Sequence, residues 1–263
     1  MSVEHARQQA KQAGVDETVI DRLLTAAKRR QIHSSTQIQW LRHLQTAAEE
    51  GLPFEPLNNK IEEGLAKNIP GERIAATVKK SLQDLRYADT LIKQELQPDK
   101  SPGKPKAYSQ DITRLSELLS AGLDKTEIEG LFRKWRVIPL RQRVEALSFY
   151  AVVKQAGLQP TMAEQIAATG LQHGHFHGFP LELAMMIKAA RIQQISERRI
   201  MQAALQVIRG QQSVLESYRG LGIQHMHANP LTIPRRLDNI HNRGPEGNSG
   251  GDNGGGGSGG GRR

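Results

Sequence analysis

The sequence contains no cysteine among its 263 residues. This absence excludes a disulfide scaffold, a thiol nucleophile, an iron–sulfur cluster and any zinc site built on thiolates. Aromatic residues make up only 4% of the chain, too few for a base-stacking platform or an aromatic-rich recognition surface. No hydrophobic run approaches the length of about 18 residues that a membrane-spanning helix needs. We therefore expect a soluble protein without cysteine-dependent chemistry.

The N-terminal residues, MSVEHARQQAKQAG, contain no apolar core of the kind found in a secretory signal. A chain from which a signal peptide had been removed would look the same. The sequence therefore leaves the compartment unknown: periplasmic or secreted if the N-terminus has been trimmed, and otherwise cytoplasmic.

Positive charge is in excess but is not concentrated along the chain. The 36 Lys and Arg residues outnumber the 27 Asp and Glu residues, which gives a net charge of +9. Each of the segments 1–97, 98–110, 111–156, 157–227 and 228–263 carries a net charge of +1 or +2. A dedicated nucleic-acid binder usually gathers its cations, because its affinity comes from several phosphates neutralised together. The dispersed charge favours a solvated basic surface.

Two sequence markers recur along the chain. A glycine followed by Leu or Val occurs with separations of 37, 71 and 35 residues, at Gly14, Gly51, Gly122 and Gly157. An apolar residue followed by His or Pro comes 16 to 22 residues after each glycine, at Ile32, Ile69, Ile138 and Phe179. A glycine in the left-handed conformation ends helices, and a proline is favoured in the first turn of the next one. The markers predict tandem helical pairs with a period near 36 residues, with each apolar residue before a proline buried.

Apolar residues between the markers follow the i, i+3, i+4, i+7 spacing of amphipathic helices. The pattern predicts about eight helices, including long ones over 71–96 and roughly 197–219, and no segment shows the alternation of a strand. We expect an all-α fold. The expected core comprises Ile20, Leu24, Leu41, Leu44, Leu57, Ile61, Leu65, Ile74, Val78, Leu115, Leu119, Ile128, Leu131, Phe132, Val144, Leu147, Leu183, Ile187, Ile200 and Val207.

Composition divides the chain into two helical lobes. The segment QPDKSPGKPK has three prolines and a glycine among ten polar residues, so we expect a linker at 98–108 between lobes at 1–97 and 109–222. The end of the chain carries 11 of the 25 glycines between Gly244 and Gly261. Such a segment cannot offset its ordering entropy, and we expect a disordered tail over 223–263.

Two features inside the predicted helices have a packing interpretation. Gly64 and Gly130 each lie in a Glu-Gly-Leu sequence, where glycine costs about 1 kcal/mol relative to alanine. A neighbouring helix that packs too closely to leave room for a side chain would explain the glycine at both positions. Trp135 stands among cations, as a base-stacking residue does, but it also continues the apolar face of Ile128 and Phe132. We interpret Trp135 as a core residue.

Residues 51–80 resemble a repeat found in uncharacterised bacterial proteins. The matching pattern is Gly-Leu-Pro, then Lys-Ile-x-Glu-Gly-Leu-Ala-Lys, then a proline three residues before Arg-Ile, and it occurs here as GLPFEPLNNKIEEGLAKNIPGERI. Many proteins of that kind are predicted to be exported, and some end in glycine-rich tails. The resemblance implies an αα-repeat fold and carries no assigned activity.

The candidate metal site is the histidine-rich sequence His173-Gly-His175-Phe-His177. Three imidazoles with flexible glycines between them could hold Ni²⁺, Cu²⁺ or Zn²⁺. The nearest acids in sequence, Glu164 and Glu182, are too distant to suggest the carboxylate that usually orients such ligands. A polar helix–helix loop explains the same residues, so we expect at most weak metal binding and no other cofactor.

Catalytic motifs are missing from the sequence. There is no Gly-x-Ser-x-Gly, no P-loop and no dinucleotide fingerprint after a strand. The adjacent carboxylates Glu62 and Glu63 have lysines and arginines nearby, which is the composition of a solvated face. We therefore predict no catalytic residues and no enzyme.

Three functions remain as hypotheses. The first is a non-enzymatic protein-interaction or scaffold protein, because stacked helical pairs present an extended binding surface. The second is nucleic-acid binding, with the glycine-rich, arginine-ended tail as a further contact and a candidate cluster at Arg133, Lys134, Arg136, Arg141 and Arg143. The third is metal handling by the histidine-rich loop.

Overall fold

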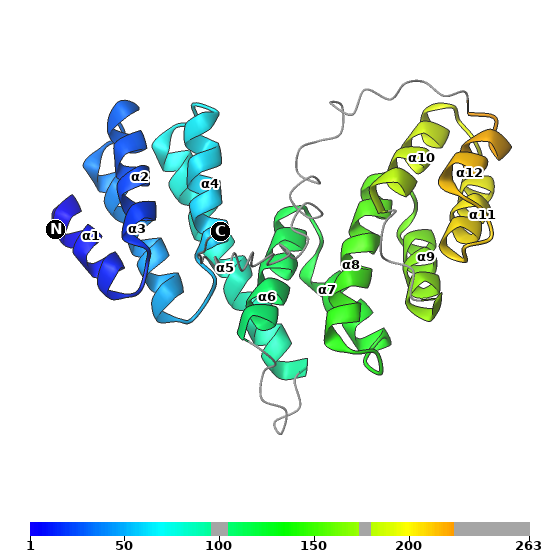
Figure 1. Cartoon of the computed structure of the whole chain (residues 1–263), viewed down its shortest axis with the longest axis horizontal. Helices are drawn as coiled ribbons and strands as arrows, with labels where there is room; N and C mark the ends of the chain where they lie inside the picture. The colour runs from blue at the N-terminus through cyan, green and yellow to red at the C-terminus, as the bar shows by residue number, and fades with distance from the viewer. Residues whose placement is uncertain (96–104, 174–179, 224–263) are drawn as a thin grey trace, which may run out of the picture. The chain divides into compact units, whose positions relative to one another are not determined.

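The computed structural model describes residues 1–95, 105–173 and 180–223, and every regular element in these ranges is an α-helix (Figure 1). The expected all-α fold is confirmed. Twelve helices are described: α1 Val3–Gln12, α2 Glu17–Arg29, α3 Ser34–Glu49, α4 Glu55–Ala66, α5 Gly71–Glu95, α6 Pro105–Ser120, α7 Lys125–Lys134, α8 Leu140–Gln155, α9 Pro160–His173, α10 Pro180–Ile192, α11 Glu197–Ile208 and α12 Val214–Gly220. No described helix is both long and apolar enough to cross a bilayer.

The described residues form twelve helices where the sequence pattern predicted about eight, and the predicted tail lies almost wholly outside the described residues. The expected helix over 197–219 is two helices, because Gly210 adopts a φ of +68° and Ser213 caps a new helix by accepting a hydrogen bond from the Glu216 N–H at 3.1 Å. The expected tail at 223–263 lies outside the described residues except for Ile223, which is buried.

The four glycine markers end helices as predicted. Each has a positive φ, between +68° and +104°. After Gly51, for example, the Leu52 N–H donates to the Ala47 carbonyl at 2.8 Å, which satisfies a carbonyl of the last turn of α3. At other helix ends the residue with a positive φ is polar instead of glycine, namely Gln31, Asn68 and Gln194. The period near 36 residues stays a prediction, since the helices range from 7 to 25 residues in length.

The proline markers begin helices, but the residues before them are less buried than expected. Pro70 directly precedes α5, Pro139 caps α8 and Pro180 is the first residue of α10. Ile69 is 38% exposed and Ile138 is only partly buried, so their predicted burial is wrong. Both lie in loops at helix ends, and Ile138 still packs against the core with part of its side chain. Phe179 lies outside the described residues.

Helices pack both on their neighbours in sequence and on their second neighbours. Contacts between second neighbours join α1 to α3, α3 to α5 and α2 to α4, and then α6 to α8, α8 to α10 and α9 to α11. In the N-terminal part, polar side chains link α2 to α4. The Arg22 guanidinium of α2 pairs with Glu62 of α4 at 2.7 Å, and the Arg30 guanidinium, directly after α2, donates to the amide oxygen of Asn68, which follows α4.

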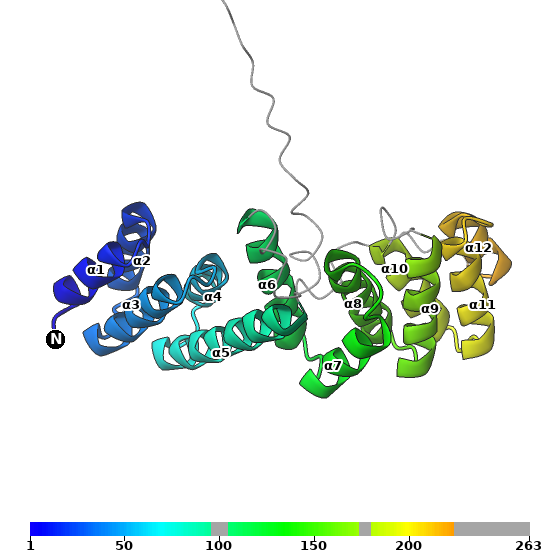
Figure 2. The same ribbon diagram turned by 90° about the horizontal axis from the view of Figure 1, so that it is seen from below.

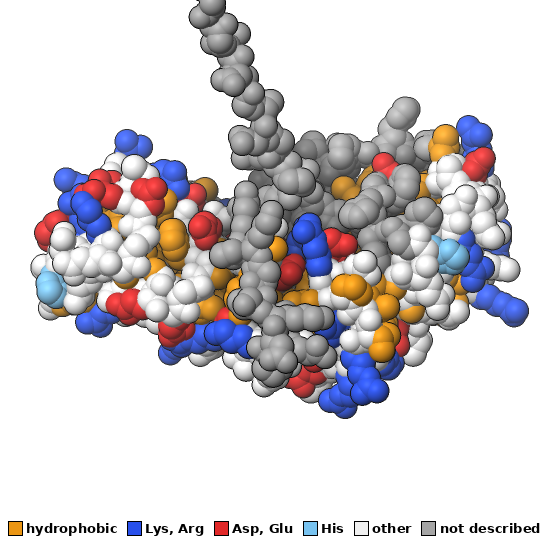
Figure 3. Space-filling view, turned by 60° about the horizontal axis from the view of Figure 1, so that its bottom comes forward, with side chains coloured by type: hydrophobic (Ala, Val, Ile, Leu, Met, Phe, Trp, Pro, Cys, Tyr) orange, Lys and Arg blue, Asp and Glu red, His pale blue; other side chains and the backbone are white. Residues whose placement is uncertain are grey.

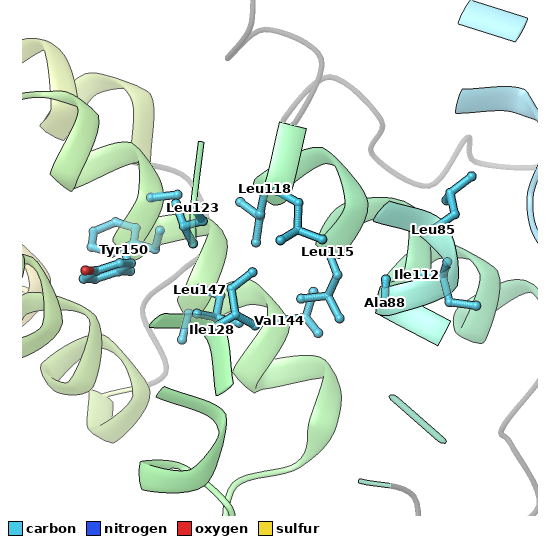
Figure 4. Packing of buried hydrophobic residues seen from close by; sticks show 14 of the residues in the cluster. Leu85, Ala88, Ile112, Leu115, Leu118, Leu123, Ile128, Val144, Leu147 and Tyr150 are labelled. Atoms are coloured by element: carbon cyan, nitrogen blue, oxygen red, sulfur yellow. The ribbon is translucent and has the colours of Figure 1, made fainter. Parts of the chain in front are cut away.

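One hydrophobic core runs through the described helices. Of the twenty residues expected in it, all are buried except Leu24, which is half-buried. The core continues across the expected linker, since Leu85 of α5, Ile112 and Leu115 of α6 and Val144 of α8 belong to one cluster (Figure 4). Helix α8 lies among α6, α7, α9 and α10 (Figure 2), and accordingly its residues from 143 to 153 are buried on almost every side.

The break between α5 and α6 is shorter than the expected linker. Helix α6 begins at Pro105, within the range 98–108, and residues 96–104 are not described. The Tyr108 hydroxyl donates to Asp89 Oδ1 at 2.6 Å, which fixes the first turn of α6 against α5.

The two helical glycines differ in their surroundings. A Cβ on Gly64 would lie 2.6 Å from Cγ1 of Ile74, so the expected close approach of α4 and α5 is confirmed there. A Cβ on Gly130 would meet nothing within 4 Å, and the packing interpretation of that residue is wrong. The Glu-Gly-Leu sequence alone did not distinguish a crowded position from an open one.

Candidate interaction surface

The cationic cluster predicted from sequence surrounds the connection between α7 and α8. We call this surface the α7–α8 corner and define it by Arg133, Lys134, Arg136, Val137 and Arg141. Helix α7 is anchored at its other end by a capping box: the Asp124 carboxylate accepts from the Thr126 N–H at 3.0 Å and the Glu127 carboxylate accepts from the Asp124 N–H at 3.4 Å. This satisfies donors that the first turn of a helix leaves unpaired.

Glu127 also ties α7 to α8. It accepts hydrogen bonds from the Tyr150 hydroxyl and from the Lys154 ammonium group, the latter at 2.7 Å. Burial raises the pKa of the Glu127 carboxyl, but the hydrogen bonds from Lys154 and Tyr150 outweigh that effect and hold the pKa below its ordinary value. Burial and the carboxylate partner raise the pKa of the Tyr150 hydroxyl. All three polar groups are thus engaged in holding the two helices together.

The turn itself is held by Trp135 and by two backbone hydrogen bonds. The Trp135 N–H donates to the Leu131 carbonyl at 3.0 Å, and the Ile138 N–H donates to the Trp135 carbonyl at 2.8 Å. The Trp135 side chain is 7% exposed and belongs to the core. The core interpretation of Trp135 is confirmed, and its ring is not presented to a base.

The residue that protrudes from this turn is Val137, which is 84% exposed. Arg133 and Arg136 are exposed beside it, and neither forms an ion pair with any residue that the structure describes. Lys134 pairs with Glu164 at 2.6 Å, and Arg141 lies 3.4 Å from Glu145. Figure 3 shows lysine and arginine side chains gathered at the lower edge of the molecule, next to a group of hydrophobic ones.

Arg143 does not belong to the exposed cluster in which the sequence placed it. It is 4% exposed, its guanidinium donates to Glu95 at 2.6 Å, and it lies over the ring of Phe132, 5.0 Å from the ring centroid. Arg143 lies two positions after Arg141, which places it about 200° around α8 and so on the opposite face, the one turned to the core. A buried guanidinium with these partners is not available to a phosphate.

Asp111 of α6 is a second buried charge close to the corner. It is 7% exposed, and burial raises the pKa of its carboxyl to about 6, although Arg114 and Arg141 lower it. Glu145 raises it further. The pKa is raised because the carboxyl has been removed from water and accepts no hydrogen bond from the residues that the structure describes.

The candidate metal site is only partly described. His173 is the last residue of α9 and is exposed, while His175 and His177 lie outside the described residues. Within the ranges that the structure covers, no group of three histidines or carboxylates could hold a metal ion. Metal handling by the loop therefore stays a prediction.

The carboxylates considered for catalysis occupy ion pairs on the surface. Glu62 pairs with Arg22, and Glu63 pairs with Lys60 at 3.3 Å and with Lys67. These contacts are what a solvated face of mixed charge provides.

No family model, curated protein or solved structure matches the chain. The resemblance of residues 51–80 to bacterial repeat proteins thus stays a prediction.

The exposure of Val137 was not predicted from the sequence, although a signal was present. Ile128, Leu131 and Trp135 lie on one helical stripe, and Val137 falls outside it. An aliphatic residue off the stripe and among four cations is a candidate for the surface.

Proposed function

We propose that this chain is a non-enzymatic scaffold protein that binds another protein on its stacked helices. The observation that supports it best is the packing of helices on their second neighbours, from α1 on α3 to α10 on α12. In this arrangement each helix buries its apolar face against neighbouring helices of the same chain. The opposite helix faces and the loops remain exposed along the array, and helical-repeat proteins bind their partners on such surfaces.

Exposed aliphatic side chains at three separate places agree with this proposal. Val137 is 84% exposed, Ile192 at the end of α10 is 66% exposed and Leu215 of α12 is 42% exposed. Each lies two positions from a buried residue, namely Trp135, Ala190 and Ser217. A partner that covers such side chains removes apolar surface from water, which favours association.

Site-specific photo-crosslinking in the cells of origin tests the proposal. A photoreactive residue replaces one exposed residue at a time, at Val137, Ile192 and Leu215 and at the polar control position Gln202 of α11. A scaffold gives discrete protein adducts at one or more apolar positions and a different pattern or none at Gln202. Adducts that disappear on nuclease treatment, or no adduct at any position, would contradict it.

A further inference from the structure

We infer that the α7–α8 corner binds an acidic peptide segment that carries an apolar side chain. The inference rests on the proposed scaffold function and names one surface and one partner chemistry for it. The contact is a single apolar anchor, Val137, with two cations, Arg133 and Arg136, beside it.

The anchor is displayed by a turn that is already in place. The hydrogen bond from the Ile138 N–H to the Trp135 carbonyl, at 2.8 Å, closes the turn, and Pro139 fixes its exit with a φ of −52°. The buried Trp135 ring holds the turn against the core from beneath. Little backbone entropy is lost on binding when the bound conformation already exists, so even a small apolar contact contributes to affinity.

The charge around the anchor selects the partner. The guanidinium groups of Arg133 and Arg136 have no ion-pair partner among the described residues, so both are free to take a carboxylate through two parallel hydrogen bonds. The neighbouring cations Lys134 and Arg141 are already paired with Glu164 and Glu145 and add positive potential without being fully available. A partner with two carboxylates around an aliphatic or aromatic side chain complements this arrangement.

Nucleic acid fits the same surface less well. Trp135 is buried and cannot stack on a base, and Arg143 is engaged with Glu95 inside the protein. A phosphate backbone would occupy the two free arginines and leave Val137 against a polar strand. Affinity for nucleic acid grows with the number of phosphates neutralised, and two free cations provide few.

An anionic membrane also fits less well. Interfacial binding depends on a broad apolar face with large side chains. The apolar face of α7 is Ile128, Leu131 and Phe132, and all three are buried in the core. Val137 is therefore the apolar side chain of the corner that could insert into a bilayer. A single valine buries too little apolar area to hold a protein on a membrane, whereas a peptide can bury it together with its own contacts to the arginines.

Peptide selection tests the inference without assuming a partner sequence. A random peptide library displayed on phage is selected against the full chain, and the recovered peptides are synthesised and measured by fluorescence anisotropy. We expect them to combine several Asp or Glu residues with an apolar one. The double variant Arg133→Ala, Arg136→Ala should bind these peptides about tenfold or more weakly. Val137→Ser should weaken binding by about three- to tenfold, because the complex then no longer buries the aliphatic side chain.

A matched control uses a second basic and apolar site. Lys28 and Arg29 are exposed cations in the last turn of α2, and Ile69 is an exposed aliphatic residue near that helix end. The triple variant with Ala, Ala and Ser at these positions should bind the selected peptides as the unmodified chain does. Circular dichroism establishes that all variants keep the helical fold.

Each other outcome overturns the inference in a recognisable way. Recovered peptides without an acidic excess, peptides insensitive to the corner substitutions, or no recovered peptide at all would overturn it. So would tighter binding of a single-stranded oligonucleotide, or of phosphatidylglycerol vesicles, when that binding is lost in the corner variants. Crosslinks at Ile192 or Leu215 alongside any of these results would preserve the scaffold function and reject this surface.

Discussion

The Arg143 guanidinium donates a hydrogen bond to the Glu95 carboxylate at 2.6 Å and thereby ties the start of α8 to the last residue of α5. The arginine is 4% exposed, and its Nε atom is buried without a hydrogen-bond acceptor in the described structure. A guanidinium buried to this extent depends on its partner, because its own atoms have little access to water when the carboxylate is removed. The pair thus connects helices that the expected linker separates in sequence.

Replacing Glu95 with alanine should lower the free energy of unfolding by about 2–3 kcal/mol, because it leaves the Arg143 charge buried and unpaired. Adding Arg143→Met should restore most of that loss, since the apolar side chain fits among Phe132 and its neighbours. Urea denaturation of the two single variants and the double variant measures the coupling.

The exposed pair of Arg22 and Glu62 is the matched control for this cycle. Its atoms lie 2.7 Å apart, close to the 2.6 Å of the Arg143–Glu95 pair, but the two side chains are 61% and 38% exposed. Glu62→Ala should therefore change stability by less than about 0.5 kcal/mol. Equal losses at Glu95 and Glu62 would show that burial of Arg143 has no energetic consequence.

The helices and most of the core could be predicted from the sequence, because they depend on local periodicity and on glycine or proline at helix ends. Gly51 ends α3 and Leu44 is buried for reasons visible within a few residues. The charges could not be placed in the same way. Arg141 and Arg143 are two positions apart, and only the way in which α8 is packed among its neighbouring helices decides that one faces solvent and the other Glu95.

The candidate surface was predictable only in part. The cations at Arg133 and Arg136 are recognisable in the sequence as a cluster, and the structure places both on the surface. The exposed residue Val137 was missed, because helical periodicity identifies the apolar residues that pack on one helix face. It does not indicate whether an apolar residue outside that face is buried or exposed. Whether such a residue is covered depends on the neighbouring helices.

Trypsin should cut the chain after Lys100, at the linker expected from the sequence, and the two helical fragments should remain associated. The bond after Lys104 resists trypsin because Pro105 follows it. Leu85 of α5 packs in the same cluster as Ile112 and Leu115 of α6, so cleavage of the connection leaves a shared core intact (Figure 4). Size-exclusion chromatography of the cleaved protein measures this. Separate elution of two folded fragments would instead support independent lobes.

The pH dependence of stability should contain a contribution from Asp111. Its pKa is about 6 in the folded protein against a reference value of 3.8, so the folded state binds the proton more tightly. Stability should therefore fall as the pH rises from about 4 to 6, by an amount of order 2 kcal/mol, and stay lower above that range. Asp111→Asn removes this contribution. The urea-derived stability difference between the two proteins should change across this window, and a constant difference would contradict the assignment.

Alanine at the two Glu-Gly-Leu glycines should have opposite effects on stability. At Gly64 the new Cβ would lie 2.6 Å from Ile74, which is itself buried and cannot move aside freely. We expect Gly64→Ala to destabilise the protein by about 1–3 kcal/mol through this overpacking. At Gly130 the Cβ meets nothing within 4 Å and the backbone is helical, so Gly130→Ala should stabilise the protein by up to about 1 kcal/mol. Urea denaturation with matched slopes measures both changes. A Gly64→Ala variant at least as stable as the unmodified chain would show that α4 and α5 can separate enough to admit the methyl group, and the close contact between Gly64 and Ile74 would not be a constraint on the fold. Destabilisation by Gly130→Ala would contradict the open surroundings of that position.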